Sequence, residues 1–279
     1  MTVSPRFILV AIGIGWAVAV FVTFTRMGNP VDAWCYYGFD PSNTYDPNGC
    51  FLYSPPVAQV MGVIQAIMPF EAFTFLLRAV ETIALVAVAG PATFFALFIP
   101  AVAIELNAVN VNLLIVVAVL LGFRYPFAWA FVILTKLSPG VGLLWFAVRR
   151  EWRNLAIAAG ATLLIAGGSY ILAPDLWRQY IEQLGREPDE SIFVIGWRLP
   201  LAALVVIWGA RTDRRWTMIV AVFLAMPRWY YLTPVILVGL FPLVRLARPL
   251  PGSRWFRSRT AQPAAAETSD GLTARAPSS

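Results

Sequence analysis

The chain has 279 residues, of which 59% are hydrophobic and only 13% are charged, and it contains no histidine. Soluble domains carry about 25% charged residues, so this composition indicates a helical membrane protein. Without histidine, and with cysteine only at Cys35 and Cys50, a structural zinc site or a histidine-based catalytic dyad is not expected. The net charge of +6 comes mainly from short arginine clusters between apolar runs, a pattern of membrane topology rather than of nucleic-acid binding.

A short basic segment ending at Arg6 is followed by an apolar run over residues 7–25. This run is long enough to cross the hydrocarbon core as a helix. A cleaved signal peptide is the alternative, but no small-residue cleavage site follows, so we expect an uncleaved first span. Residues 26–69 then form an extracytoplasmic loop, with an interfacial helix over residues 57–68.

A second span is predicted over residues 70–90, and it contains two charged residues, Arg78 and Glu81. Their spacing of three residues places both side chains on one helix face. We expect them to neutralise each other inside the helical bundle, because an isolated charge at membrane depth is costly.

Polar or helix-breaking stretches interrupt three later apolar segments. They are residues 105–112 within 93–122, residues 135–140 within 127–148, and residues 226–231 within 217–244. A straight span in the second or third segment would place the arginine cluster that follows it outside, against the positive-inside rule. We therefore expect pairs of short helices that meet at each interruption, with proline and glycine supplying the break over residues 135–140.

Two further spans are predicted over residues 154–173 and 192–210, joined by an outer amphipathic segment over residues 174–190. The predicted fold is thus an all-α polytopic membrane domain over residues 1–248, with roughly nine or ten crossings when half-helices are counted. Residues 249–279 are rich in Ala, Pro, Ser and Thr, which predicts a disordered tail.

The distribution of positive charge supports this topology. The predicted inner segments hold most of the 21 Lys and Arg residues, whereas the predicted outer loops hold only Arg26, Arg178 and Arg186. Cytoplasmic segments of membrane proteins carry such an excess. Both termini are therefore expected to be cytoplasmic.

We call the polar stretch over residues 105–112, where the chain turns back between two short helices, the crest. In this topology it faces the outer side, together with the first loop and the last two helix breaks. Side chains that carry chemistry therefore converge at one depth, including Asp32, Lys136 and Arg228 with the crest asparagines. Ionisable groups inside a bundle are costly and mark substrate paths. A cation there suits a phosphate, and Asp32 suits a base for a hydroxyl nucleophile, so the pattern favours group transfer from a lipid phosphate.

Each of these residues also has a simpler interpretation. Asp32 could only cap a turn, Lys136 could snorkel to the interface, and the asparagines could only satisfy backbone groups at a tight crest. Arg228 could lie in an unbroken span. The loop aromatics, Tyr53 among them, suit an interfacial belt as well as a sugar platform.

Cys35 and Cys50 are the only cysteines, and both lie in the first outer loop. A disulfide between them is favoured in an oxidising compartment. Two buried free thiols are the alternative.

The most specific motif is LTKLSPGVGLLWFAVRREWR over residues 134–153. Together with FLYSPP at residues 51–56 and the pattern NxxNxNLL from Asn107, it resembles glycosyltransferase family 87. That family comprises bacterial, largely actinobacterial, membrane enzymes of the GT-C superfamily that use polyprenyl-phosphate mannose. The likeness extends from about residue 30 to residue 245.

This resemblance implies a GT-C helical bundle in a bacterial plasma membrane and an inverting sugar transfer on its outer face. The expected sugar is mannose, moved from a polyprenyl-phosphate donor to a glycolipid or glycan acceptor. Asp32 would be the general base, with Asp40 in reserve. Lys136 would hold the donor phosphate, with Arg228 as a helper.

By the same resemblance, Tyr53, Asn110 and Asn112 would line the cleft. The expected partners are the lipid-linked sugar, the acceptor and membrane lipids, with no nucleic acid. No metal or other cofactor is implied, because a lipid phosphate donor has no nucleoside diphosphate to neutralise.

The chain departs from the family in length, since 279 residues are fewer than the resemblance leads us to expect, and the missing part could include acceptor-binding structure. A non-catalytic membrane subunit or lipid-binding protein that keeps the donor site is one competing hypothesis. A small transporter is the other, because broken helices at membrane depth also occur in transporters. The two halves show no inverted repeat, which weakens the transporter hypothesis.

Overall fold

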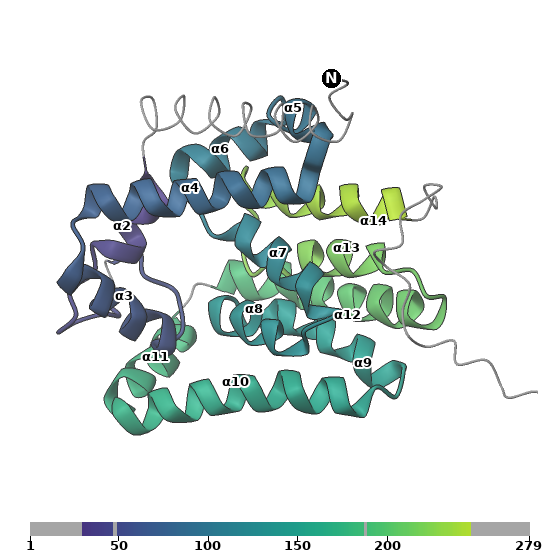
Figure 1. The fold of residues 1–279 in the computed structure, drawn as a ribbon. Coiled ribbons are helices and arrows are strands. Elements are labelled where there is room, and N and C mark those ends of the chain that lie inside the picture. The colour runs from purple at the N-terminus through teal and green to yellow at the C-terminus, as the bar shows by residue number, and fades with distance from the viewer. Residues whose placement is uncertain (1–29, 47–48, 187–188, 247–279) are drawn as a thin grey trace, which may run out of the picture.

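A computed structural model describes residues 30–46, 49–186 and 189–246, and these residues form helices and turns without a β-strand. Figure 1 shows α4 and α10 on opposite sides of a helical bundle, with α7, α8, α12 and α13 between them. The predicted first span over residues 7–25 and the predicted tail over residues 249–279 lie outside the described residues.

The elements follow one another along the chain with short connections, except for residues 38–54 between the first two. They are α2 Val31–Tyr37, α3 Pro55–Ile67, α4 Phe70–Ala89, η1 Gly90–Ala92, α5 Thr93–Ala96, α6 Pro100–Ala108, α7 Asn112–Gly122, η2 Pro126–Ala128, α8 Trp129–Thr135, η3 Ser138–Leu143, α9 Leu144–Val148, α10 Trp152–Leu172, α11 Pro174–Arg186, α12 Asp189–Arg211, α13 Trp216–Ala225, η4 Thr233–Gly239 and α14 Leu240–Leu246. Several begin with proline, which lacks the N–H that the first helical turn leaves unpaired.

Two helical segments within the described residues are long and apolar enough to cross a membrane, Phe70–Ala96 and Trp152–Leu172. The pair Pro100–Ala108 and Asn112–Gly122, bent by 106° at the crest, makes a third if it counts as one span. The predicted nine or ten crossings counted half-helices and included residues 7–25, which lie outside the described residues. Most of the other predicted apolar stretches fold as shorter apolar helices of 10–17 residues.

The predicted helix breaks over residues 135–140 and 226–231 are both present. Helix α8 ends at Thr135, and the backbone of Lys136 is extended (φ −144°, ψ 113°) before η3 begins at Ser138. Helix α13 ends at Ala225, and the next helical turn begins at Thr233. Pro139 and Pro227 lie at these breaks, where each lacks the N–H that a continuous helix would need.

Three basic turns meet at one end of the bundle. Arg149 Nη1 lies 2.8 Å from Asp213 Oδ1, which joins the turn before α10 to the turn between α12 and α13. The guanidinium of Arg215 stacks 5.5 Å from the ring centroid of Phe123, at the end of α7. The predicted grouping of these basic segments on one side is therefore present in the fold.

The opposite end holds α2, α3 and α11 (Figure 1). Gln183 Nε2 of α11 donates to the carbonyl of Phe51 at 3.2 Å, and Gln59 Nε2 of α3 donates to the carbonyl of Ser169 at 3.2 Å. The first loop is thus attached to the end of α10 and to the helix that follows it.

The expected pairing of Arg78 with Glu81 does not form. Both side chains are buried, but Arg78 Nε donates to the carbonyl of Leu106 at 3.3 Å, and neither carboxyl oxygen of Glu81 has a hydrogen-bond partner among the described residues. A shared helix face allows two side chains to meet, but a backbone carbonyl of the neighbouring helix α6 takes the arginine instead.

Candidate functional site

A cavity of about 1620 Å³ opens between the first loop, the crest that joins α6 to α7, and the two helix breaks. It is larger than the roughly 300–1,000 Å³ typical of pockets for small molecules. Its wall includes Asp32, Asn110, Lys136 and Arg228, which come from four separate parts of the chain. Asp32, Asn110 and the two predicted cations therefore share one cavity. The prediction that Asn112 also lines the cleft is wrong, because its side chain is buried behind the wall.

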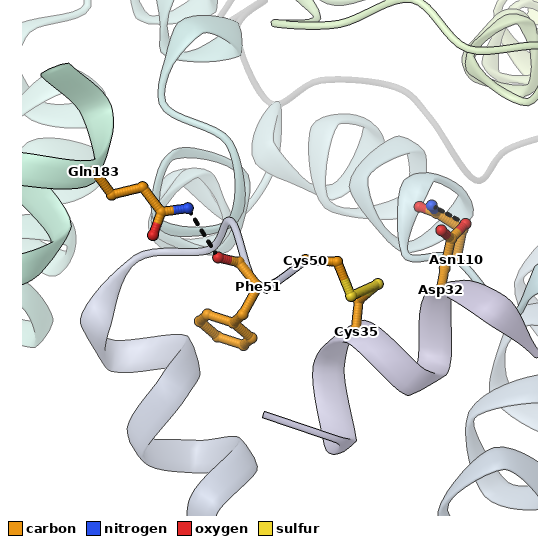
Figure 2. The surroundings of a disulfide bond; sticks show 6 residues. All are labelled: Asp32, Cys35, Cys50, Phe51, Asn110 and Gln183. Atoms are coloured by element: carbon orange, nitrogen blue, oxygen red, sulfur yellow. Dashed lines mark hydrogen bonds between the residues drawn. A yellow bond between two sulfur atoms is a disulfide. The ribbon is translucent and has the colours of Figure 1, made fainter. Parts of the chain in front are cut away.

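Asp32 lies in the first turn of α2 and is partly exposed to the cavity. It makes no capping hydrogen bond in that turn; instead, its Oδ2 accepts a hydrogen bond from Asn110 Nδ2 at 2.7 Å (Figure 2). The other end of this amide, Asn110 Oδ1, accepts from the backbone N–H of Val111 at 2.7 Å. Asn110 is thereby held in one orientation, with its donor on the carboxylate.

The first loop is cross-linked next to this carboxylate. A disulfide joins Cys35, one helical turn after Asp32, to Cys50 in the segment that leads to α3 (Figure 2). Tyr45 Oη donates to the carbonyl of Tyr53 at 2.8 Å, and Ser54 Oγ donates to the carbonyl of Leu134 at the end of α8. These links tie the loop to the break that carries Lys136.

Lys136 lines the cavity, and a residue of the crest forms a hydrogen bond with it from the side away from the cavity. Its Nζ donates to Asn112 Oδ1 at 2.8 Å, and Asn112 Nδ2 donates to Glu105 Oε2 at 3.1 Å. Glu105 Oε1 also accepts the backbone N–H of Leu113 in the first turn of α7 at 3.1 Å. Glu105 and Asn112 are fully buried, and neither forms part of the cavity wall.

The sequence placed Glu105 in the polar crest but assigned it no role. The sequence did contain a signal for this contact, because Glu105 precedes Asn112 of the NxN pattern by seven residues. The turn between α6 and α7 was the missing information, because only that turn brings Glu105 back to the N-terminus of α7.

The crest contains an unusual backbone conformation. Val109 ends α6 in the left-handed region (φ 58°, ψ 61°) and is fully buried. A β-branched residue rarely adopts this conformation, which costs on the order of 1–3 kcal/mol and occurs most often at functional sites. The resulting turn allows Asn110 to reach α2 while Asn112 reaches Lys136.

Arg228 reaches the same cavity from the break between α13 and η4, and its Nη1 lies 3.4 Å from Tyr230 Oη. Arg198 of α12 supports the segment on both sides of Arg228. It donates from Nη2 to the carbonyl of Pro227 at 3.2 Å, and its guanidinium stacks 4.5 Å from the ring centroid of Trp229. The sequence assigned no site role to Arg198.

Tyr53, also predicted to line the cleft, forms part of the cavity wall. Its ring packs edge-on against Tyr36 at 5.0 Å between centroids. Burial raises the pKa of both phenols, so both stay neutral at physiological pH and present hydroxyls rather than charges.

The reserve base Asp40 lies elsewhere. It is exposed and absent from the cavity wall, and its Oδ1 accepts hydrogen bonds from the backbone N–H and the hydroxyl of Ser42 at 2.8 and 2.7 Å. These bonds lower the pKa of Asp40. Between the two aspartates, only Asp32 faces the cavity.

Much of the cavity wall is apolar. Leu137, Val141, Leu144, Leu155 and Leu199 line it between η3, α9, α10 and α12. The cavity can therefore hold an anionic headgroup at Lys136 and Arg228 while it shelters an apolar chain.

Residues 155–210 match a family described as "Uncharacterized protein conserved in bacteria (DUF2065)". The matched segment begins within α10, includes α11 and ends within α12. No curated protein and no solved structure matches the chain. The resemblance to glycosyltransferase family 87 thus rests on the sequence motifs.

Proposed function

We propose that this protein is a membrane glycosyltransferase of the GT-C type. It moves a sugar, mannose by the resemblance, from a polyprenyl-phosphate donor to a glycolipid or glycan acceptor on the extracytoplasmic face. Transfer proceeds with inversion at the anomeric carbon.

One observation carries this proposal: a single cavity is lined by the carboxylate of Asp32, by the cations Lys136 and Arg228 and by many apolar side chains. A base for the acceptor and a phosphate-binding group for the donor are the two requirements of this reaction. The apolar residues between α9, α10 and α12 suit the polyprenyl chain of the donor.

In the proposed reaction, Asp32 accepts the proton of an acceptor hydroxyl. The acceptor oxygen forms a bond to the anomeric carbon on the side opposite the donor phosphate, and the bond from that carbon to the phosphate oxygen breaks. Polyprenyl phosphate leaves with the bonding electron pair, and Lys136 and Arg228 stabilise its added charge. The hydrogen bond from Asn110 keeps Asp32 oriented for this proton transfer.

The test uses membranes that contain the chain, radiolabelled polyprenyl-phosphate mannose and a native lipid extract. Wild-type protein is expected to transfer label to a new product, and Asp32→Asn to abolish transfer while it still inserts and folds. The matched control is Asp175→Asn, which removes an exposed aspartate of α11 at the same end of the bundle and leaves transfer unchanged.

Asp40→Asn separates the two candidate bases, because transfer should survive this change if Asp32 is the base. Full activity of Asp32→Asn, with loss in Asp40→Asn, would show that the base is wrongly assigned. If folded wild-type protein binds the lipid phosphate but transfers no mannose, other sugar donors are tested first. Failure with every donor would favour the non-catalytic lipid-binding protein.

A further inference from the structure

Lys136 is the only lysine in the sequence, among 21 residues of Lys and Arg. A lysine ammonium is a compact, rotatable charge that readily loses its proton when it is desolvated. A lysine that is to bind an anion in an apolar cavity therefore needs a partner that keeps it charged and fixes its direction. Glu105 and Asn112 are placed to do both.

We propose that Glu105 is a positioning residue for the phosphate-binding cation, which acts through Asn112 to hold Lys136 toward the cavity. This inference rests on the proposed function, because it assigns Lys136 to the donor phosphate. It adds a residue that never touches the substrate.

The argument depends on the polarity of the hydrogen bonds. Both carboxyl oxygens of Glu105 accept N–H groups, as an ionised carboxylate does, whereas an asparagine amide has a donor end and an acceptor end. Glu105 takes the donor end, because Asn112 Nδ2 lies 3.1 Å from Glu105 Oε2. The acceptor end, Asn112 Oδ1, must then face Lys136 Nζ, at 2.8 Å.

The position of Glu105 also decides the sign of its electrostatic effect. Its carboxylate lies behind Asn112 and outside the cavity wall, so it is separated from a bound phosphate by Asn112 and Lys136. A negative charge in that place repels the phosphate less than it stabilises the ammonium in front of it. Removal of the charge should therefore weaken phosphate binding.

A purely structural role is the alternative, because Glu105 also accepts the N–H of Leu113 at the start of α7. Glu105→Gln separates the two roles. Glutamine keeps a carbonyl oxygen for Leu113, but its amide nitrogen is a donor and faces the donor end of Asn112. The Asn112 amide then turns over, and Lys136 loses its acceptor.

The experiment measures equilibrium binding of radiolabelled farnesyl phosphate to the full chain in lipid nanodiscs, with empty nanodiscs as the blank. Glu105→Gln is expected to weaken binding about tenfold, the effect of one hydrogen bond to a charged group. The matched control is Glu81→Gln, which removes another fully buried carboxylate, one that makes no hydrogen bond to Asn112. This control leaves the hydrogen bonds that join Glu105, Asn112 and Lys136 in place, so a clearly smaller loss than that of Glu105→Gln is expected.

A second readout follows Lys136 itself. Only a neutral amine reacts with acylating reagents, so Glu105→Gln should speed the labelling of Lys136 in the absence of ligand. Because the chain has one lysine, mass spectrometry of the peptide around residue 136 reports on that side chain alone. If Glu105 only caps α7 and does not act on Lys136, Glu105→Gln would leave the labelling rate of Lys136 unchanged.

A double-mutant cycle completes the test. If Glu105 acts through Lys136, then Glu105→Gln should add no further loss in a Lys136→Gln background. Folding of each variant is checked by thermal unfolding. If Glu105→Gln does not fold, Asn112→Ala cuts the same link and leaves Glu105 its bond from Leu113, so the same loss is expected.

The outcomes separate this inference from the proposed function. Equal or tighter binding by folded Glu105→Gln, together with weaker binding by Lys136→Gln, overturns the positioning role alone. Unchanged binding by Lys136→Gln overturns the phosphate site, and with it both proposals. Equal losses in Glu105→Gln and Glu81→Gln indicate a general effect of buried charge and also overturn the positioning role.

Discussion

At the scale of single residues, two asparagines two positions apart serve opposite groups. Asn110 donates to the carboxylate of Asp32, and Asn112 accepts from the ammonium of Lys136. Each amide has its other end fixed, by the backbone N–H of Val111 in one case and by Glu105 in the other. The two candidate reactive groups are therefore oriented by the same turn.

This arrangement predicts the effect of Asn110→Ala on sugar transfer. Loss of a hydrogen bond to a charged group costs about 1.5–3 kcal/mol, so the transfer rate should fall by roughly 10- to 100-fold. The radiolabel assay in membranes measures this rate at saturating donor. Asn43→Ala, which truncates an exposed amide of the first loop, serves as the control, and equal effects of the two changes would refute the orienting role.

At the scale of elements, a close contact between η3 and α8 sets the position of the break that contains Lys136. Gly142 of η3 packs against the ring of Trp129 in α8, and an added Cβ would collide with that ring and come within 2.9 Å of Met218 Sδ. The absent side chain lets η3 fold back beside α8. The direction of the Lys136 segment depends on this packing.

Gly142→Ala should therefore lower the unfolding temperature, since overpacking of a core costs roughly 1–3 kcal/mol. Gly160→Ala is the matched substitution in α10, where nothing lies within 4 Å of the added Cβ. There alanine should leave stability unchanged or raise it by about 1 kcal/mol through its higher helix propensity. Thermal unfolding in detergent measures both, and equal shifts would contradict the packing explanation.

At the scale of the whole molecule, the two ends differ in character. One end gathers the basic turns around Arg149, Asp213 and Arg215, and the other holds the first loop, α3 and α11. By the positive-inside rule, we expect the basic end to be cytoplasmic. The first loop and α11, which contribute residues to the cavity wall, are then expected on the outer side.

This orientation predicts the reactivity of single cysteines introduced at exposed positions of the two ends. In intact spheroplasts, a membrane-impermeant thiol reagent should label Asn43→Cys but should label Thr212→Cys only after permeabilisation. The native pair Cys35 and Cys50 is replaced by serine in both variants, because a reduced pair would react as well. The reverse pattern would invert the orientation and place the cavity in the cytoplasm.

The sequence by itself determined the helical class, the two broken helices and the set of polar residues that would be costly in a membrane. Composition, the spacing of apolar runs and the positions of Pro139 and Pro227 carry that information locally. The number of full-length crossings was not determined by the sequence, because a short apolar stretch can be a half-helix or part of a longer span.

Only the tertiary structure decided which polar groups meet. Asp32 and Asn110 are 78 residues apart in the chain, and Arg78 contacts the carbonyl of Leu106 rather than its predicted neighbour Glu81. Residue spacing sets the helix face on which a side chain lies, but the partner on that face comes from another helix. The packing of distant helices therefore selected these contacts, because burial of a polar group costs less free energy where a partner lies within hydrogen-bond distance.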